Sequence, residues 1–210
     1  MKVTALSDAH AMVKDLIIPS TDVLVYAGDW SNGGSMSETA RFIYWMTQQP
    51  AKYKIAVAGN HDMFCEQSPN LARKMFEESG IIYLEDQEVT IEGKRFYGTP
   101  WFVKFHHWAF GRTEEWLAET FKLIPFNLDF LICHTPPKGI LDQCGSIHIG
   151  SQSLFDRLEF ITPKRVIFGH KHKKGKAVAK LGGKEIEFYN VAVTDESYNI
   201  VEEPTVIEVK

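Results

Sequence analysis

Short apolar runs alternate with polar segments along the chain and predict buried strands. Five of these runs contain four to six residues rich in Val, Ile, Leu or Phe, and polar residues follow each of them at once. The runs are KVTALS, DVLVYA, KIAVA, LDFLIC and RVIF.

Amphipathic segments between the runs predict helices. From 37 to 48, Phe42, Trp45 and Met46 fall on one helical face, and Pro50 ends the pattern. Gly80 ends a second segment in the position expected of a helix C-cap. The predicted helices span residues 37–48, 71–78, 112–121 and 151–160.

Further segments predict antiparallel strands. A meander is expected over 81–84, 87–91 and 94–98, with Glu92-Gly93 as its hairpin turn. Strands are also expected at 176–180, 184–191 and 205–209, with Gly182-Gly183 as a tight turn. Strand–helix alternation followed by antiparallel strands predicts an α/β fold, a four-layer αββα sandwich of two mixed β-sheets flanked by helices. No internal repeat or linker is evident, so one domain over residues 1–210 is expected.

The composition is ordinary for a globular protein. Of 210 residues, 44% are hydrophobic and 24% are charged, and the net charge of −4 does not favour stable nucleic-acid binding. Three cysteines without a CxxC spacing favour a reducing compartment. A strand beginning at Lys2 leaves no room for a signal peptide, and no apolar stretch has the roughly eighteen residues of a membrane span. We therefore expect a cytoplasmic protein without a membrane partner. The oligomeric state stays open.

Residues of metal-binding type follow all five apolar runs. In an open α/β sheet, ligands bind just beyond the carboxyl ends of the strands, so these residues are expected at one edge of one sheet. They are Asp8 and His10, Asp29, Asn60 with His61 and Asp62, His134, and His170 with His172.

The spacing of these residues suggests how they converge. Asp8 and His10 are two positions apart, as are His170 and His172, and side chains at i and i+2 of an extended chain point to the same side. The same alternation turns Cys133 away from its neighbour His134, so Cys133 is expected in the core. Each i, i+2 pair could therefore bind one metal from one direction.

The donors are oxygen and nitrogen without a thiolate, which favours Mn²⁺, Fe, Zn²⁺ or Mg²⁺. Seven candidate donors are too many for one tetrahedral zinc. They suit two divalent ions about 3.5–4 Å apart that share a carboxylate. Such a centre attracts an anion and lowers the pKa of bound water.

The ordered set DxH, GD, GNHD, a lone His and GHxH resembles the calcineurin-like metallophosphoesterases, over residues 8 to 172. The resemblance implies a metallophosphoesterase fold and a Mn²⁺-favouring dinuclear hydrolase, in which a bridging hydroxide attacks phosphorus. It implies that His61 protonates the leaving oxygen or stabilises its charge, and Asp62 is a candidate partner for a histidine. The implied ligands are Asp8, His10 and His172 for one metal, Asn60, His134 and His170 for the other, and Asp29 as the bridge.

Two details narrow the substrate. Many Ser/Thr phosphatases of the family read GDxxDRG, but segment 28–34 reads GDWSNGG, with Asn32 in place of the second Asp and no Arg to clamp phosphate. The stretches GTPW at 98–101 and HTPP at 134–137 resemble the small metallophosphoesterase-domain-containing proteins. This likeness implies phosphodiesterase activity on a small phosphorylated substrate, with cyclic nucleotides as one class.

Several alternatives remain open at this stage. A nuclease is the runner-up hydrolase, although the acidic net charge argues against it, and a non-catalytic interaction scaffold is the competing class. The aromatic and imidazole residues near the motifs could stack on a nucleobase or contact phosphate, or could pack within their own loops. These candidate substrate contacts are Trp30, Asn32, Trp101, His106 and His107, the last two next to Trp108.

Overall fold

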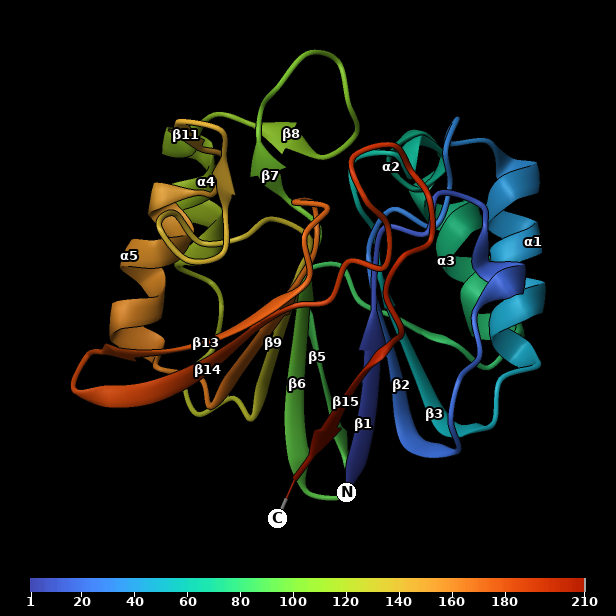
Figure 1. The fold of residues 1–210 in the computed structure, drawn as a ribbon, viewed down its shortest axis with the longest axis horizontal. Coiled ribbons are helices and arrows are strands. Elements are labelled where there is room, and N and C mark those ends of the chain that lie inside the picture. The colour runs from blue at the N-terminus through green and yellow to red at the C-terminus, as the bar shows by residue number, and fades with distance from the viewer. Residues whose placement is uncertain (210) are drawn as a thin grey trace.

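Two β-sheets pack face to face at the centre of the molecule, and helices cover both outer sides (Figure 1). The computed structural model describes residues 1–209. The first sheet has the order β15-β1-β2-β3-β4, and only the β1–β15 pair in it is antiparallel. Its strands are β1 (Lys2–Leu6), β2 (Thr21–Ala27), β3 (Ala51–Val57), β4 (Ile82–Tyr83) and β15 (Thr205–Glu208).

The second sheet has the order β13-β14-β12-β9-β6-β5. Its four inner strands are parallel, and the strand at each edge is antiparallel to its neighbour. Its strands are β5 (Gln87–Ile91), β6 (Lys94–Thr99), β9 (Phe130–Cys133), β12 (Arg165–Phe168), β13 (Gly175–Leu181) and β14 (Lys184–Asn190). The predicted four-layer αββα arrangement is confirmed.

The helices lie in two outer layers, with α1 and α3 beside the first sheet and α4 and α5 beside the second (Figure 1). Side chains of Ser35, Thr113 and Ser151 accept hydrogen bonds from the first turns of α1, α4 and α5, which fixes where these helices begin. The helices are α1 (Met36–Thr47), α2 (Met63–Gln67), α3 (Pro69–Glu78), α4 (Glu114–Phe121) and α5 (Gln152–Ile161), with a 3₁₀ turn η1 (Val13–Asp15).

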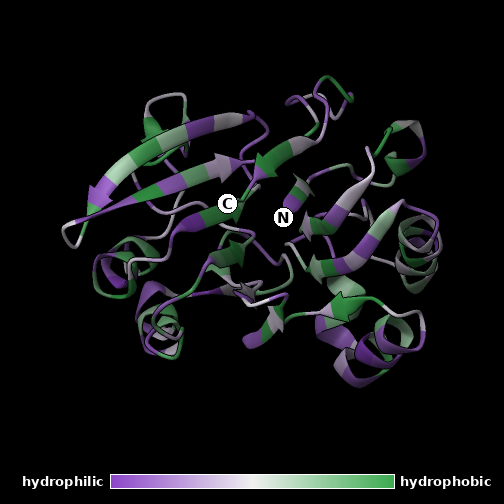
Figure 2. Ribbon diagram, turned by 90° about the horizontal axis from the view of Figure 1, so that it is seen from below, coloured by the Kyte–Doolittle hydropathy of each residue, from purple (hydrophilic) through white to green (hydrophobic). Residues whose placement is uncertain are grey.

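Three hydrophobic clusters separate the four layers. In β2, Val23 and Val25 face the cluster between the sheets, while Leu24 and Tyr26 face the cluster under α1 and α3. A strand buried on both faces has no polar side to show, which explains why the five runs are apolar without alternation. Figure 2 shows the hydrophobic colouring along the strands between the helical layers.

The predicted meander over 81–98 is wrong. The segment at 81–84 contributes only the two-residue strand β4, which runs parallel to β3 in the first sheet, whereas β5 and β6 form an antiparallel hairpin in the second. Leu84 and Gly98 pack against each other where the chain crosses between the sheets, so sequence proximity masks a change of layer. Both expected hairpin turns are confirmed, because Glu92, Gly93, Gly182 and Gly183 all have positive φ.

Four short features escaped sequence analysis. Helix α2 and turn η1 are too short to show a hydrophobic period. Small two-stranded pairs also form, β7 (Phe102–Val103) with β8 (Gly111–Arg112) and β10 (Gln143–Cys144) with β11 (Ile147–His148). Within residues 1–209, every helix is too short or too polar to cross a bilayer.

Candidate metal centre

The loops that follow β1, β2, β3, β9 and β12 meet at one edge of the two sheets and bring the seven predicted ligands together. The expectation that all five strands share one sheet is wrong, because β1, β2 and β3 lie in the first sheet and β9 and β12 in the second. In Figure 1 this edge is the upper one, opposite the two chain ends. Asp8, His10 and His172 form one cluster of candidate donors, called here the first ligand group. Asn60, His134 and His170 form the second ligand group, and Asp29 lies between the two.

The segment that carries Asp8 and His10 is not extended. Asp8, His10 and Ala11 have φ values of 58°, 43° and 69°, in the left-handed region that non-glycine residues rarely adopt. The i, i+2 reasoning for this pair is therefore wrong, although its convergence on His172 is observed. It is also wrong for His170 and His172, because His170 has a φ of 65° and the two rings lie in different ligand groups. Such backbone is held only where its surroundings over-determine it, and here the N–H groups of Asp8 and His10 donate to the carbonyls of Gly28 and Asp29.

Two glycines allow the close approach of the motifs. A Cβ on Gly59 would lie 2.3 Å from Oδ1 of Asp29, and one on Gly169 would lie 2.1 Å from Oδ2 of Asp8. Real side chains cannot occupy that space without moving a carboxylate. The glycines of GNHD and GHxH are thus required by packing against the two acidic ligands.

In the first ligand group, two imidazole nitrogens face each other. Nδ1 of His172 lies 3.1 Å from the carbonyl oxygen of Asp195, which can only accept, so the proton of the neutral ring lies on Nδ1. Its bare Nε2 then lies 3.1 Å from Nε2 of His10 and 3.6 Å from Oδ1 of Asp8. Two nitrogens bound about 2.1 Å from one ion would stand roughly 3.0–3.4 Å apart, so the spacing fits a shared cation.

The second ligand group shows the same pattern. Nδ1 of His134 lies 3.0 Å from the carbonyl oxygen of Ala27, so its Nε2 is bare in the neutral ring. Nε2 of His134 and Nδ1 of His170 each lie 2.8 Å from Oδ1 of Asn60, which is itself an acceptor. Buried acceptors facing one another are unfavourable unless a cation or a proton lies between them. The donor set therefore fits a divalent metal.

Asp29 occupies the bridging position. Its Oδ2 lies 3.3 Å from Nε2 of His134 and 4.0 Å from Nε2 of His10, one imidazole from each group. Burial alone would raise the pKa of Asp29, but the positive charge of His134 and its hydrogen bond lower it. Burial likewise opposes protonation of His134, and Asp29 outweighs it and raises the pKa of His134 to about 9. In the absence of a metal ion, a proton on His134 balances the negative charge of Asp29.

His61 borders the first ligand group, and one of its ring nitrogens lies near donor atoms of His10 and Asp29. Its ring centroid lies 4.6 Å from that of His10, and its Nδ1 lies 2.8 Å from the carbonyl oxygen of Asn32. The carbonyl fixes the Nδ1 proton, which leaves Nε2 free to carry or release a second one. The backbone carbonyl of Asn32, the residue that stands in place of the second Asp of GDxxDRG, thus orients the His61 ring.

Asp62 does not partner a histidine. Its fully buried carboxylate accepts hydrogen bonds from the backbone N–H groups of Asp29, Ser31 and Gly59 and from the Ser31 hydroxyl. None of the described hydrogen bonds of Asp62 involves a histidine, so the predicted contact is wrong. Asp62 instead connects the GNHD loop to the GD loop. Its hydrogen bond from the N–H of Asp29 holds that residue in place.

The predicted substrate contacts lie in different environments. Trp30 is 1% exposed and stacks on Phe42 at 4.6 Å, so it belongs to the core and cannot form a substrate wall. Trp101 donates to Asp86 at 2.6 Å and packs under the guanidinium of Arg112, away from the ligands. Asn32 contributes its carbonyl oxygen to His61. His106 and His107 are exposed, and the ring contact of His106 is with Phe105.

Two aromatic side chains flank the centre instead. Trp108 lies 4.1 Å from His61 between ring centroids, and Tyr198 lies 4.5 Å from His10 and 5.2 Å from His172. Both are partly exposed, at 36% and 41%. Trp108 was visible in sequence as part of an aromatic cluster. Tyr198 follows no motif, and no sequence signal indicates that the loop after β14 returns to the ligands.

Comparison with known proteins agrees with this geometry. The family model described as calcineurin-like phosphoesterase matches residues 1–174. The chain is 35% identical over 186 residues to UPF0046 protein K07C11.7 of Caenorhabditis elegans, covering 83% of this chain and 64% of the relative. It is 32% identical over 228 residues to metallophosphoesterase domain-containing protein 1 of Homo sapiens, covering 97% of this chain and 69% of the relative. The match thus spans about two thirds of these relatives.

Solved structures share the fold at low sequence identity. The phosphopantetheinyl hydrolase of Mycobacterium tuberculosis superposes with a TM-score of 0.67 at 17% identity, covering 94% of this chain and 90% of that one. A protein of Thermus thermophilus superposes with a TM-score of 0.64 at 15% identity, covering 92% and 89%. These likenesses concern the arrangement of sheets and helices alone.

Proposed function

Because this chain belongs to the calcineurin-like phosphoesterase family, we propose that it is a hydrolase of small phosphodiesters that works with two divalent metal ions, Mn²⁺ foremost. One observation carries the proposal. Asp29 lies between two groups of buried nitrogen and oxygen atoms of metal-binding type, with a singly anchored histidine, His61, at their border.

Each ligand group would bind one of the two metal ions. Asp8, His10 and His172 would hold one ion, Asn60, His134 and His170 the other, and Asp29 both. Divalent ions in such a centre neutralise phosphate charge and lower the pKa of bound water. The imidazoles anchored on Ala27 and Asp195 are oriented before binding, which reduces the cost of assembling the centre.

His61 is suited to proton transfer at the leaving oxygen. The carbonyl of Asn32 holds its Nδ1 proton, so Nε2 is the atom that can donate a proton to an ester oxygen. The ring is 7% exposed, which limits competition from bulk water. Positioned general acids of this kind contribute about 10²–10⁴-fold to rate.

The mouth of the centre supports a diester with a flat group. Trp108 and Tyr198 present half-exposed rings on either side of the imidazole cluster, where an aryl or nucleobase group could stack. Segment 28–34 supplies no guanidinium to clamp the dianion of a phosphomonoester. Cyclic nucleotides combine both properties and are the substrates to test first.

A matrix of metals and substrates tests the proposal. With Mn²⁺, we expect faster hydrolysis of bis(p-nitrophenyl) phosphate and cyclic nucleotides than of phosphopeptides, and no cleavage of single- or double-stranded DNA on gels. Preferential phosphopeptide hydrolysis would refute the diester assignment. DNA cleavage would favour the nuclease alternative.

Replacing the proposed acid separates an enzyme from a scaffold. His61→Ala should lower kcat about 10²–10⁴-fold and leave the metal content unchanged, because His61 is not among the proposed ligands. Wild-type protein with two bound ions but no turnover on any phosphoester would instead identify an interaction scaffold. Elemental analysis accompanies every assay.

A further inference from the structure

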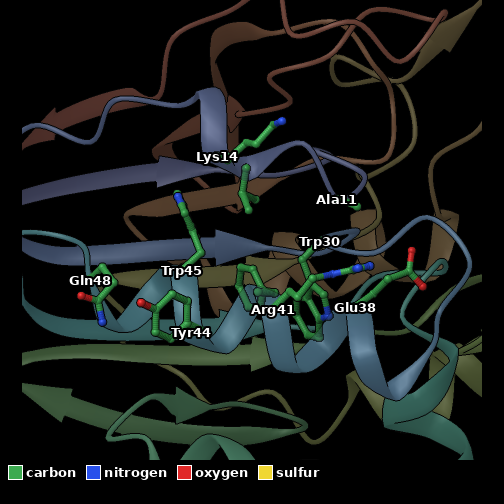
Figure 3. A pocket seen from close by; sticks show the side chains of 10 residues that line it. Ala11, Lys14, Trp30, Glu38, Arg41, Tyr44, Trp45 and Gln48 are labelled. Atoms are coloured by element: carbon green, nitrogen blue, oxygen red, sulfur yellow. The ribbon is translucent and has the colours of Figure 1, made fainter.

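The turn 169–172 carries the proposed ligands His170 and His172 and contains no apolar side chain. It reads GHKH, and KKGK follows it. The loop after β2, which carries Asp29, is anchored differently, because its residue Trp30 packs against α1 in the core (Figure 3). Hydrophobic packing of its own residues cannot fix the turn 169–172, so hydrogen bonds must fix its shape.

Within the described part of the chain, two side chains hydrogen-bond to the backbone of this turn. The carboxylate of Asp8 accepts from the N–H of His170 at 3.1 Å, and Asp8 is itself a proposed ligand. The other side chain is that of Asn190, the last residue of β14. Its Nδ2 donates to the carbonyl of Lys171 at 2.9 Å and lies 3.5 Å from that of Gly169. Asn190 therefore contacts the carbonyls on both sides of His170.

The orientation of the Asn190 amide is fixed by its neighbours. Its Oδ1 accepts from the N–H of Ala192 at 3.1 Å, and a backbone N–H can only donate. Its Nδ2 faces carbonyl oxygens, which can only accept. The side chain is fully buried, so bulk water does not compete for these contacts. Neither a carboxylate nor an apolar side chain at this position could form the same set of hydrogen bonds.

The segment that follows Asn190 connects the turn to the end of β1. The N–H of Ser7 donates to the carbonyl of Val191, and the N–H of Val193 donates to the carbonyl of Ser7, both at 3.1 Å. Ser7 directly precedes the proposed ligand Asp8. Asn190 thus relates the ligands that follow β1 in the first sheet to those that follow β12 in the second.

We propose that Asn190 is a positioning residue of the metal centre and directs His170 and His172 to different ions. This inference rests on the proposed two-metal function. His170 has a φ of 65°, so the chain bends between the two rings, and Asn190 holds the carbonyl of the residue between them. The His170 ring then contacts Asn60 in the second ligand group, while the His172 ring lies beside His10 in the first. Loss of the Asn190 amide should release the turn and disturb both groups at once.

Calorimetric titration with Mn²⁺ is the first test. Asn190→Ala should weaken both sites at least about tenfold, as loss of an orienting partner typically does, because the turn contributes one imidazole to each group. Asn190→Asp also lacks the N–H donors and should weaken both sites despite its added negative charge. Two sites of unchanged affinity in Asn190→Ala would refute this inference alone. A wild type with fewer than two sites would refute the two-metal function and this inference with it.

A matched control separates positioning from general destabilisation. Asp129 is also buried and polar, and its carboxylate accepts from the N–H of Arg95 at 3.0 Å. It directly precedes β9, at the end of that strand opposite to His134. Asp129→Ala and Asn190→Ala should both lower the Tm of the metal-free protein, because each removes a buried hydrogen-bonding side chain.

The response of the Tm to metal should differ between these two variants. A fixed concentration of Mn²⁺ raises the Tm according to how tightly the folded protein binds it. The rise should match the wild type in Asp129→Ala and be smaller in Asn190→Ala, because only the second variant loses affinity for the metal. Equal rises in the two variants would mean that Asn190 supports the fold alone, and would overturn its role in positioning the ligands.

Discussion

The two ligand groups of the metal centre use the same residue types but are held by different parts of the fold. In the second group, His134 is fixed by the carbonyl of Ala27 at the end of β2, in the interior of a sheet. In the first group, His172 is fixed by the carbonyl of Asp195, in the loop that follows β14. The second group therefore depends on the sheet, and the first depends on a loop.

The difference extends to His10. Its Nδ1 is buried, and no described atom hydrogen-bonds to it. The ring is positioned by edge contacts with His61 and Tyr198, at 4.6 and 4.5 Å between centroids. A buried imidazole held by packing tolerates movement better than one held by a strand carbonyl. We infer that the first group loses its metal more readily, and the following variants are ordered by expected effect.

Asp29→Asn should have the largest effect, because the Asp29 carboxylate lies between His10 of the first group and His134 of the second. The substitution keeps the shape but removes the charge that balances two cations, so neither metal should survive gel filtration and kcat/KM should fall at least about 10³-fold. Asp156→Ala, an exposed carboxylate on α5, serves as the control. Retention of both metals in Asp29→Asn would refute the proposal that Asp29 binds both ions. The division of the centre into two groups around Asp29 would then also be wrong.

His134→Ala should separate the groups. It removes the imidazole anchored on β2, so the second metal should bind at least about 100-fold more weakly while the first group stays largely formed. Calorimetric titration with Mn²⁺ should then show one strong site in place of two. His172→Ala is the reciprocal variant and should leave the second group intact. Loss of both metals in His134→Ala would mean that the groups are not independent.

The two ligand groups also differ in how much of them could be predicted from the sequence. The second group and its strands were predictable because β9 and β12 are buried and apolar, and His134 and His170 stand one and two positions after them. The supports of the first group were not predictable. Asp195 and Tyr198 contact it only because a loop crosses back from β14, where the N–H of Val193 donates to the carbonyl of Ser7 and the Thr194 hydroxyl donates to that of Asp8.

Local backbone geometry also could not be predicted from the pattern of residues. The DxH spacing suggested an extended pair, but three left-handed residues at 8, 10 and 11 produce the convergence. A two-residue strand such as β4 has no period to detect, so its sheet could not be assigned from sequence. Likewise, Trp30 stands beside a ligand in sequence and faces the opposite way, into the aromatic stack under α1.

Asp195→Ala should weaken the first group alone. The Asp195 carboxylate accepts from the N–H groups of Ser197 and Asn199, both at 2.9 Å, and so closes the turn that presents its own carbonyl to His172. Opening that turn should reduce first-group affinity for Mn²⁺ about tenfold, as loss of an orienting contact typically does. Asp195→Asn can form the same turn and should restore most of the affinity. Equal weakening of the second group would contradict the assignment.

Tyr198→Ala should have the smallest effect, and it tests whether packing alone positions His10. Removing one edge contact from His10 should weaken the first metal about threefold, in line with the energy of a single aromatic pair. Tyr198→Phe keeps the ring and should match the wild type, because no described hydrogen bond uses the Tyr198 hydroxyl. Titrations in a His134→Ala background isolate the first group. If Tyr198→Phe weakened binding as much as Tyr198→Ala, the hydroxyl would be the active feature, and His10 would depend on a polar contact like its counterpart His134.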